Sequence, residues 1–158
     1  MKKFAANYLI SETSAFLKNG IVVLNDEGEV QEIVDTGGDL QEMAQLTFLN
    51  GILIPNFRLV KFLSESKQVN NDVSVQALIS RLADGLTEIS LHHWIEISVQ
   101  VQKQFPNKTI PEIFGDMNVE LQTSLGYSKQ NISGLFLLKG IDLVTMYFTS
   151  GIRLKKIL

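Results

Sequence analysis

The first third of the chain alternates short apolar runs with turn residues, a pattern typical of a small β-sheet. We expect Asn19-Gly20 to form a hairpin turn, because both residues tolerate positive φ. Asn50-Gly51 is expected to form another turn, and Pro55 to end the strand that follows it. This spacing predicts a small antiparallel sheet or sandwich, with strands at residues 4–6, 8–10, 15–17, 21–24, 30–34, 46–49 and 52–54.

After a polar linker at residues 64–72, the apolar positions recur at spacings of three and four, as on one face of a helix. We expect Asp84-Gly85 to break this helix, because glycine disfavours a helix interior. The apolar positions of this face are Val75, Leu78, Leu82, Leu86 and Ile89.

Two further helices are predicted before the strands return. The first has Leu91, Trp94, Ile95 and Phe105 on one face and ends at Pro106. The other begins with Thr109 and Glu112, which have the spacing of a capping box, and ends at Gly126. It would bury Phe114, Met117, Leu121 and Leu125.

The C-terminal part again reads as strands, at residues 134–138, 143–148 and 152–158, with Ser150-Gly151 as a turn. The order strands, helices, strands predicts an α+β domain whose sheet draws strands from both ends of the chain. We therefore expect one domain over residues 1–158, a small composite β-sandwich of N- and C-terminal strands with about three α-helices inserted between them. Its predicted parts are N-terminal strands at 1–63, the linker at 64–72, a helical insert at 73–126 and C-terminal strands at 132–158.

Composition excludes several kinds of partner and metal site. The chain has 158 residues, 45% of them hydrophobic and 20% charged, which suits one globular domain. A formal net charge of −3 gives no electrostatic reason to expect nucleic acid as a partner. Without cysteine there are no disulfides, iron–sulfur clusters or thiolate zinc sites.

The apolar runs also bear on location. Asn7 interrupts the N-terminal run, which is too short for the apolar core of a secretory signal. Other apolar stretches fall far short of the ~20 residues that span a bilayer. The basic residues at 153–156 are expected to be a solvated strand end. We expect a cytoplasmic protein that binds no membrane.

His92 and His93 are the only histidines, and they are adjacent. Metal ligands on one helix need spacings of three or four residues, whereas adjacent side chains point about 100° apart. Gly37-Gly38 lacks the residues of a phosphate-binding loop, and no serine or threonine lies in a nucleophile-elbow context. The residues alone therefore predict no catalytic residue, no metal site and no cofactor.

Three N-terminal segments, at residues 17–23, 26–30 and 50–57, resemble the start of amidohydrolase-superfamily enzymes. These are metal hydrolases such as cytosine deaminases, chlorohydrolases, imidazolonepropionases and dihydroorotase-like enzymes. The family's segment forms half of a small β-sandwich and ends in a Pro-Gly-Phe-type strand, matched here by Pro55-Asn56-Phe57. Residues 104–143 are similar to the family's last barrel helices and closing sandwich strands. The resemblance covers roughly residues 1–60 and 86–158.

The resemblance implies a catalytic barrel that is almost wholly deleted, because a TIM barrel takes about 250 residues. The family's His-x-His metal pair would fall at Lys61 and Leu63, an ammonium group and a hydrocarbon that cannot bind zinc. Asp84 matches the aspartate that follows the family's last barrel strand. One carboxylate without histidine partners would not hold the metal.

Helices that packed on a barrel would have to rebury their apolar surface, so we expect a homodimer with helices from residues 73–105 packed between protomers or exchanged. Its interface would use Leu91, Trp94, Ile95 and Phe105, although a core role also explains these residues. The predicted function is non-catalytic, through self-association or binding to a full-length amidohydrolase relative. Two alternatives remain: a residual metal-dependent hydrolase or deaminase acting on C–N bonds through Asp84, His92 or His93, and a remnant without a selected task.

Overall fold

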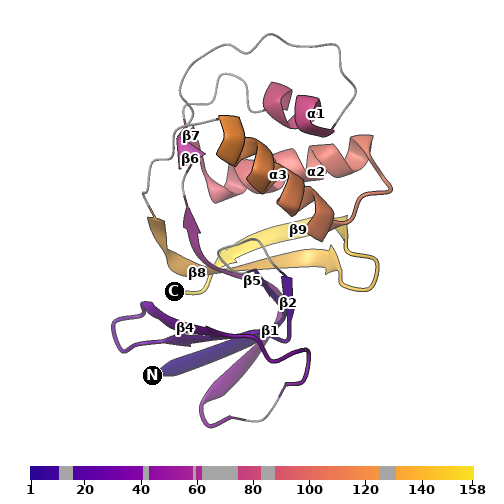
Figure 1. The fold of residues 1–158 in the computed structure, drawn as a ribbon. Helices are drawn as coiled ribbons and strands as arrows, with labels where there is room; N and C mark the ends of the chain where they lie inside the picture. Colours follow the sequence, from indigo (N-terminus) through magenta and orange to yellow (C-terminus); the bar gives the residue numbers. More distant parts are fainter. Residues whose placement is uncertain (11–15, 41–42, 59, 62–74, 83–87, 125–130) are drawn as a thin grey trace. The chain divides into compact units, whose positions relative to one another are not determined.

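The computed structural model describes residues 1–10, 16–40, 43–58, 60–61, 75–82, 88–124 and 131–158. The chain divides into two compact units. One unit joins the two ends of the chain, Met1–Phe57 and Ile132–Leu158, and the other comprises Arg58–Asn131. Strands dominate the first unit and helices the second (Figure 1). The predicted α+β class is confirmed.

The first unit is built on one seven-stranded sheet, in the order β4-β3-β1-β5-β8-β9, with β2 also paired to β1. The pairs of β1 with β2 and β3, of β3 with β4 and of β8 with β9 are antiparallel. By contrast, β1 and β5 are parallel, so the sheet is mixed and the antiparallel prediction is wrong at this pair. Strands β1 and β4 run in the same direction, because both are antiparallel to β3. After β4 the chain therefore has to cross back to the end of the sheet where β1 begins, because β5 starts beside Lys3. The strands are β1 (Lys2–Ile10), β2 (Phe16–Lys18), β3 (Ile21–Leu24), β4 (Val30–Val34), β5 (Leu46–Arg58), β8 (Asn131–Asp142) and β9 (Tyr147–Lys156).

Strand β5 is continuous through Asn50-Gly51 and Pro55, where the sequence predicted a turn and a strand end. Gly51 has a φ of 137°, and the register between β1 and β5 shifts between Ala6 and Tyr8. The backbone N–H of Gly51 donates to Asn7 Oδ1 at 2.8 Å. The Asn-Gly pair therefore marks an irregularity inside a strand rather than a hairpin.

The β8–β9 hairpin also differs from the prediction. Its turn lies between Asp142 and Tyr147, inside the predicted strand 143–148, and Gly151 lies within β9. The carboxylate Oδ1 of Asp142 accepts hydrogen bonds from the backbone N–H of Val144 at 2.9 Å and of Thr145 at 3.1 Å. A Cβ on Gly140 would overlap the backbone of Gly151, so this glycine allows a close approach of the two strands.

One hydrophobic cluster of the sheet contains residues from β1, β3, β5 and β8. Its described members all come from the sheet strands and Ile157, so both parts of the sheet contribute to one core. In this way, the strands from the two ends of the chain form the composite unit expected from the element order. The buried members are Ala6, Leu9, Val22, Leu24, Leu53, Leu135 and Leu137.

The second unit contains α1 (Val75–Leu82), α2 (Leu91–Gln104), α3 (Ile110–Ser124) and the strand pair β6 (Val60–Lys61) with β7 (Glu88–Ile89). The predicted helices are confirmed, but Ile89 lies in β7 rather than on a helical face. Glu112 Oε1 accepts from Thr109 Oγ1 at 2.9 Å and from the backbone N–H of Thr109 at 3.5 Å, as the capping-box pattern predicts. The breaks predicted at Asp84-Gly85 and Gly126 lie outside the described residues. None of the described helices has the length and apolar character needed to cross a membrane.

Candidate functional site

The two histidines lie in the first turn of α2, and both side chains are exposed. The Oγ of Ser90 accepts a hydrogen bond from the backbone N–H of His93 at 3.2 Å and lies 3.1 Å from His93 Nδ1. Ser90 has extended backbone angles and is the N-cap of the helix. The contacts of His93 with Ser90 are therefore those of a helix start.

The described residues form no metal site around the candidate ligands His92 and His93. Among them, no group of three or more histidine, aspartate or glutamate side chains could hold a metal ion. Asp84 and Leu63 lie outside the described residues, and Lys61 lies in β6. The structure thus gives His92 and His93 no third ligand within its described part.

The residues predicted at an interface lie on α2 and at its end. Leu91, Trp94 and Ile95 are buried, and Phe105 is the half-buried C-cap residue. The ring of Trp94 meets that of Phe114 edge-on, with centroids 6.2 Å apart and planes at 72°. Such a contact between α2 and α3 is what a core role requires. The interface role of these residues stays a prediction.

A different group of apolar side chains is exposed near the start of β5. Leu40 and Met43 are each 39% exposed and Phe48 is 42% exposed. Met43 and β5 are linked by a hydrogen bond from the backbone N–H of Leu46 to the carbonyl of Met43. We call Leu40, Met43 and Phe48 the apolar trio.

Phe48 ends a row of apolar side chains across four strands of the sheet. In the register of the strand pairs, Val34 lies beside Ile21, Ile21 beside Ala5, and Ala5 beside Phe48. Ile21 and Ala5 are 1% and 0% exposed, so exposure is greatest at the Phe48 end. We call these four residues the Phe48 row.

The neighbouring row on the same face carries opposite charges. Its members are Glu32, Val23, Lys3 and Leu46 in the order β4, β3, β1, β5. Val23 is buried and belongs to the same small cluster as Ala5 and Ile21. This face of the sheet thus combines an apolar row with a glutamate and a lysine, each next to Val23.

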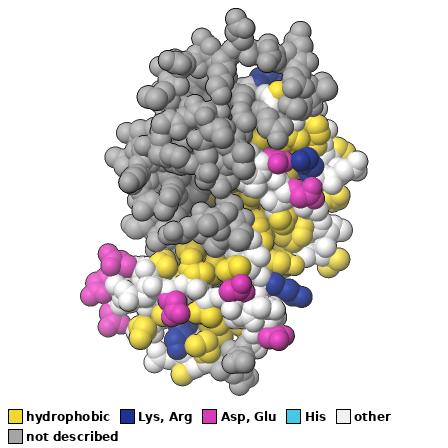
Figure 2. Space-filling model, in the orientation of Figure 1, with side chains coloured by type: hydrophobic (Ala, Val, Ile, Leu, Met, Phe, Trp, Pro, Cys, Tyr) yellow, Lys and Arg dark blue, Asp and Glu magenta, His cyan; other side chains and the backbone are white. Residues whose placement is uncertain are grey.

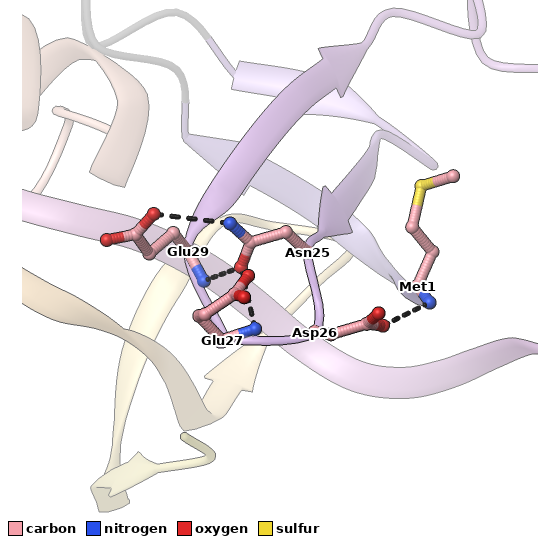
Figure 3. A network of polar contacts seen from close by, with 5 residues as sticks. All are labelled: Met1, Asn25, Asp26, Glu27 and Glu29. Atoms are coloured by element: carbon pink, nitrogen blue, oxygen red, sulfur yellow. Dashed lines mark hydrogen bonds and ion pairs between the residues drawn. The ribbon is translucent and has the colours of Figure 1, made fainter.

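The turn between β3 and β4 gathers acidic side chains, which Figure 2 shows at the tip of this hairpin. Asn25 Oδ1 accepts from the backbone N–H groups of Glu27 at 3.0 Å and Glu29 at 2.8 Å, so the asparagine organises the turn (Figure 3). The N-terminal ammonium of Met1 contacts Asp26 Oδ1 at 2.9 Å. Its hydrogen bond and charge lower the pKa of Asp26 from the usual value. These contacts account for the turn itself and point to no ligand.

Comparison with known proteins gives little further guidance. No family model matches the chain, and no curated protein matches it. A crystal structure of Helicobacter pylori aminofutalosine deaminase, in complex with methylthio-coformycin, is similar at 14% sequence identity and a TM-score of 0.27. The match covers 80% of this chain and 28% of the deaminase chain. A likeness this weak carries no argument about the activity of the chain, and membership of the amidohydrolase superfamily stays a prediction.

The sequence did not single out the apolar trio. Alternation in residues 46–49 correctly indicated a strand. Which face of β5 is exposed depends on its parallel pairing with β1, and local periodicity does not reveal that pairing.

Proposed function

We propose that this chain acts by associating with a second copy of itself and carries out no catalysis. The observation behind this proposal is the apolar trio, whose large side chains are 39%, 39% and 42% exposed within a short stretch of chain. Contiguous exposed apolar surface is typical of interaction sites, and the nearness of these three residues in the sequence is what suggests such a surface here. Association would remove Phe48 and its neighbours from water.

A second copy is the partner that the face itself favours. A two-fold axis beside Phe48 would oppose the phenylalanine of one copy to that of the other, because the middle of the row, Ile21 and Ala5, is already buried within one chain. Such an isologous contact closes as a dimer.

The experiment is sedimentation velocity on the wild type and on Phe48→Ser. Burial of a phenylalanine side chain contributes about 1.5–3 kcal/mol, so we expect dimer affinity to fall at least about tenfold in the variant. Val144→Ser is the matched control, because Val144 is 94% exposed in the β8–β9 turn and should not affect the dimer. Equal dimer affinities for wild type and Phe48→Ser would overturn the proposed contact.

The hydrolase alternative is tested on the same samples. A residual enzyme using His92 or His93 predicts stoichiometric metal in the purified protein, and its loss in the double variant His92→Ala/His93→Ala. Self-association alone predicts a protein that dimerises with or without metal.

A further inference from the structure

We propose that the two edges of the sheet form a second contact between copies, with β4 of one copy pairing to β9 of the next. This contact is separate from the face around Phe48 and rests on different residues. Strands β4 and β9 are the outer members of the seven-stranded order. Among the described strands, each therefore has one side without a neighbour, where backbone N–H and C=O groups can accept another strand.

The two edges carry opposite charges. The β4 edge and its hairpin present exposed acidic side chains, and this part of the chain, residues 25–35, contains no lysine or arginine. Strand β9 presents exposed basic side chains and contains no aspartate or glutamate. The acidic residues are Asp26, Glu27, Glu29, Glu32 and Asp35, and the basic ones are Arg153, Lys155 and Lys156.

This charge pattern selects which edges can pair. Two β4 edges would bring glutamates together, and two β9 edges would bring lysines and arginines together, and like charges on facing strands are destabilising. A β4 edge against a β9 edge instead places opposite charges across the new strand pair. The occupant of each edge is therefore the opposite edge of another copy of this chain.

The length of the strands permits such pairing. Strand β4 has 5 residues and β9 has 10, so β9 can accept the whole of β4. Because each copy would use two different edges, the contact is head to tail. Head-to-tail contacts produce rings or open chains rather than a closed pair. The expected species are larger than a dimer and grow with protein concentration.

The test uses charge reversal on the full chain. The β4-reversed variant is Glu27→Lys/Glu32→Lys, which spares Glu29 because its carboxylate accepts from Asn25 Nδ2 at 3.2 Å in the turn. The β9-reversed variant is Arg153→Glu/Lys155→Glu. Lys103→Glu on α2 is the control, since Lys103 is an exposed residue of the other unit. Circular dichroism and thermal melting establish that each variant is folded.

Sedimentation velocity is then measured at low and high salt for each variant and for an equimolar mixture of the two reversed variants. We expect wild type and Lys103→Glu to form species larger than a dimer at low salt and to lose them at high salt. Each reversed variant alone should lose most of them, because the reversal takes the charge of the β4 edge from −5 to −1, or that of β9 from +3 to −1. The mixture should form mixed pairs, because the unchanged β9 edge of one variant can meet the unchanged β4 edge of the other.

Three results would overturn the edge contact. They are wild-type species no larger than a dimer, reversed variants that assemble like wild type, and a mixture of folded variants that stays unassembled. In none of these cases does the result decide the contact around Phe48, which is measured by the dimer affinity of Phe48→Ser. The two proposals therefore fail independently.

Discussion

The side chain of Asn7 on β1 accepts a hydrogen bond from the backbone N–H of Gly51 on β5, with 2.8 Å between Oδ1 and N. The contact lies where the register of these parallel strands shifts, between Ala6 and Tyr8. Asn7 thus supplies an acceptor to a backbone donor at the irregularity. Its carbonyl also accepts from the backbone N–H of Asn19 at 3.0 Å, so one residue connects β1 to two other parts of the sheet unit.

Replacing the acceptor should weaken the sheet unit. Asn7→Ala leaves the N–H of the buried Gly51 without this partner, and we expect a loss of about 1 kcal/mol in the free energy of unfolding. Asn7→Asp keeps an acceptor at the same position and should lose less. Chemical denaturation of both variants measures the difference. Equal losses for alanine and aspartate would show that the hydrogen bond does not stabilise the sheet.

Gly51 should tolerate no side chain. Its φ of 137° favours glycine, and a Cβ would lie 2.5 Å from the carbonyl oxygen of Leu138. The backbone strain alone costs about 1–3 kcal/mol, and the overlap adds to it, so Gly51→Ala should lower the melting temperature strongly.

Gly115→Ala is the matched substitution for Gly51→Ala. Gly115 lies within α3, and a Cβ there would meet nothing within 4 Å outside its own helix backbone and chain neighbours. Alanine in a helix interior is favoured over glycine by about 0.5–1 kcal/mol, so this variant should melt at a higher temperature than wild type. Destabilisation by Gly115→Ala would contradict the open space at this position.

Substitutions at the start of α2 distinguish a helix-capping role from a metal-binding role for this segment. Ser90→Ala removes the side-chain acceptor of the His93 N–H, and we expect a loss of about 1 kcal/mol in the free energy of unfolding. His92→Ala should change stability within about 0.5 kcal/mol, because the His92 side chain is exposed. Thermal melting of wild type and of the two variants, with and without a chelator, measures both stability changes and their dependence on metal. A chelator-dependent melting temperature in wild type that His92→Ala abolishes would contradict this account.

Asp142 should make stability depend on acid pH. Hydrogen bonds from the backbone N–H groups of Thr145 and Val144 hold the pKa of this carboxyl below its usual value. The native state therefore binds the proton less readily than the unfolded chain, and the stabilisation is present above the unfolded-state pKa. It is lost as the pH falls through the native pKa. Asp142→Asn should melt below wild type at neutral pH, and the gap should close in acid. A gap that is the same at both pH values would contradict the assignment.

Local sequence predicted the helices well because their signals are local. The Thr109 and Glu112 spacing correctly placed the start of α3, and the apolar face with Leu91 and Trp94 is buried as its period requires. Whether a glycine-containing dipeptide forms a turn was harder to predict. Asn19-Gly20 follows β2 at a turn, as predicted, whereas Asn50-Gly51 and Ser150-Gly151 lie inside strands. Each dipeptide permits a turn or an irregularity, and the neighbouring strand decides between them.

The candidate surfaces were less predictable for the same reason. The exposure of Phe48 depends on its position opposite Ala5, and the edge positions of β4 and β9 depend on the order of the whole sheet. Neither is a property of a short window of sequence. The adjacency of His92 and His93, by contrast, is a property of the sequence itself, and it argues against a shared metal ion because neighbouring side chains on a helix point in different directions.

The central claim is that this chain acts through association with itself. The most direct measurement is the mass of the wild-type protein in solution, by light scattering over a range of protein concentrations, with metal content determined on the same samples. The account predicts a metal-free protein with at least twice the mass of one chain. A metal-free monomer at every concentration would contradict it, and stoichiometric metal bound to a monomer would favour the residual enzyme.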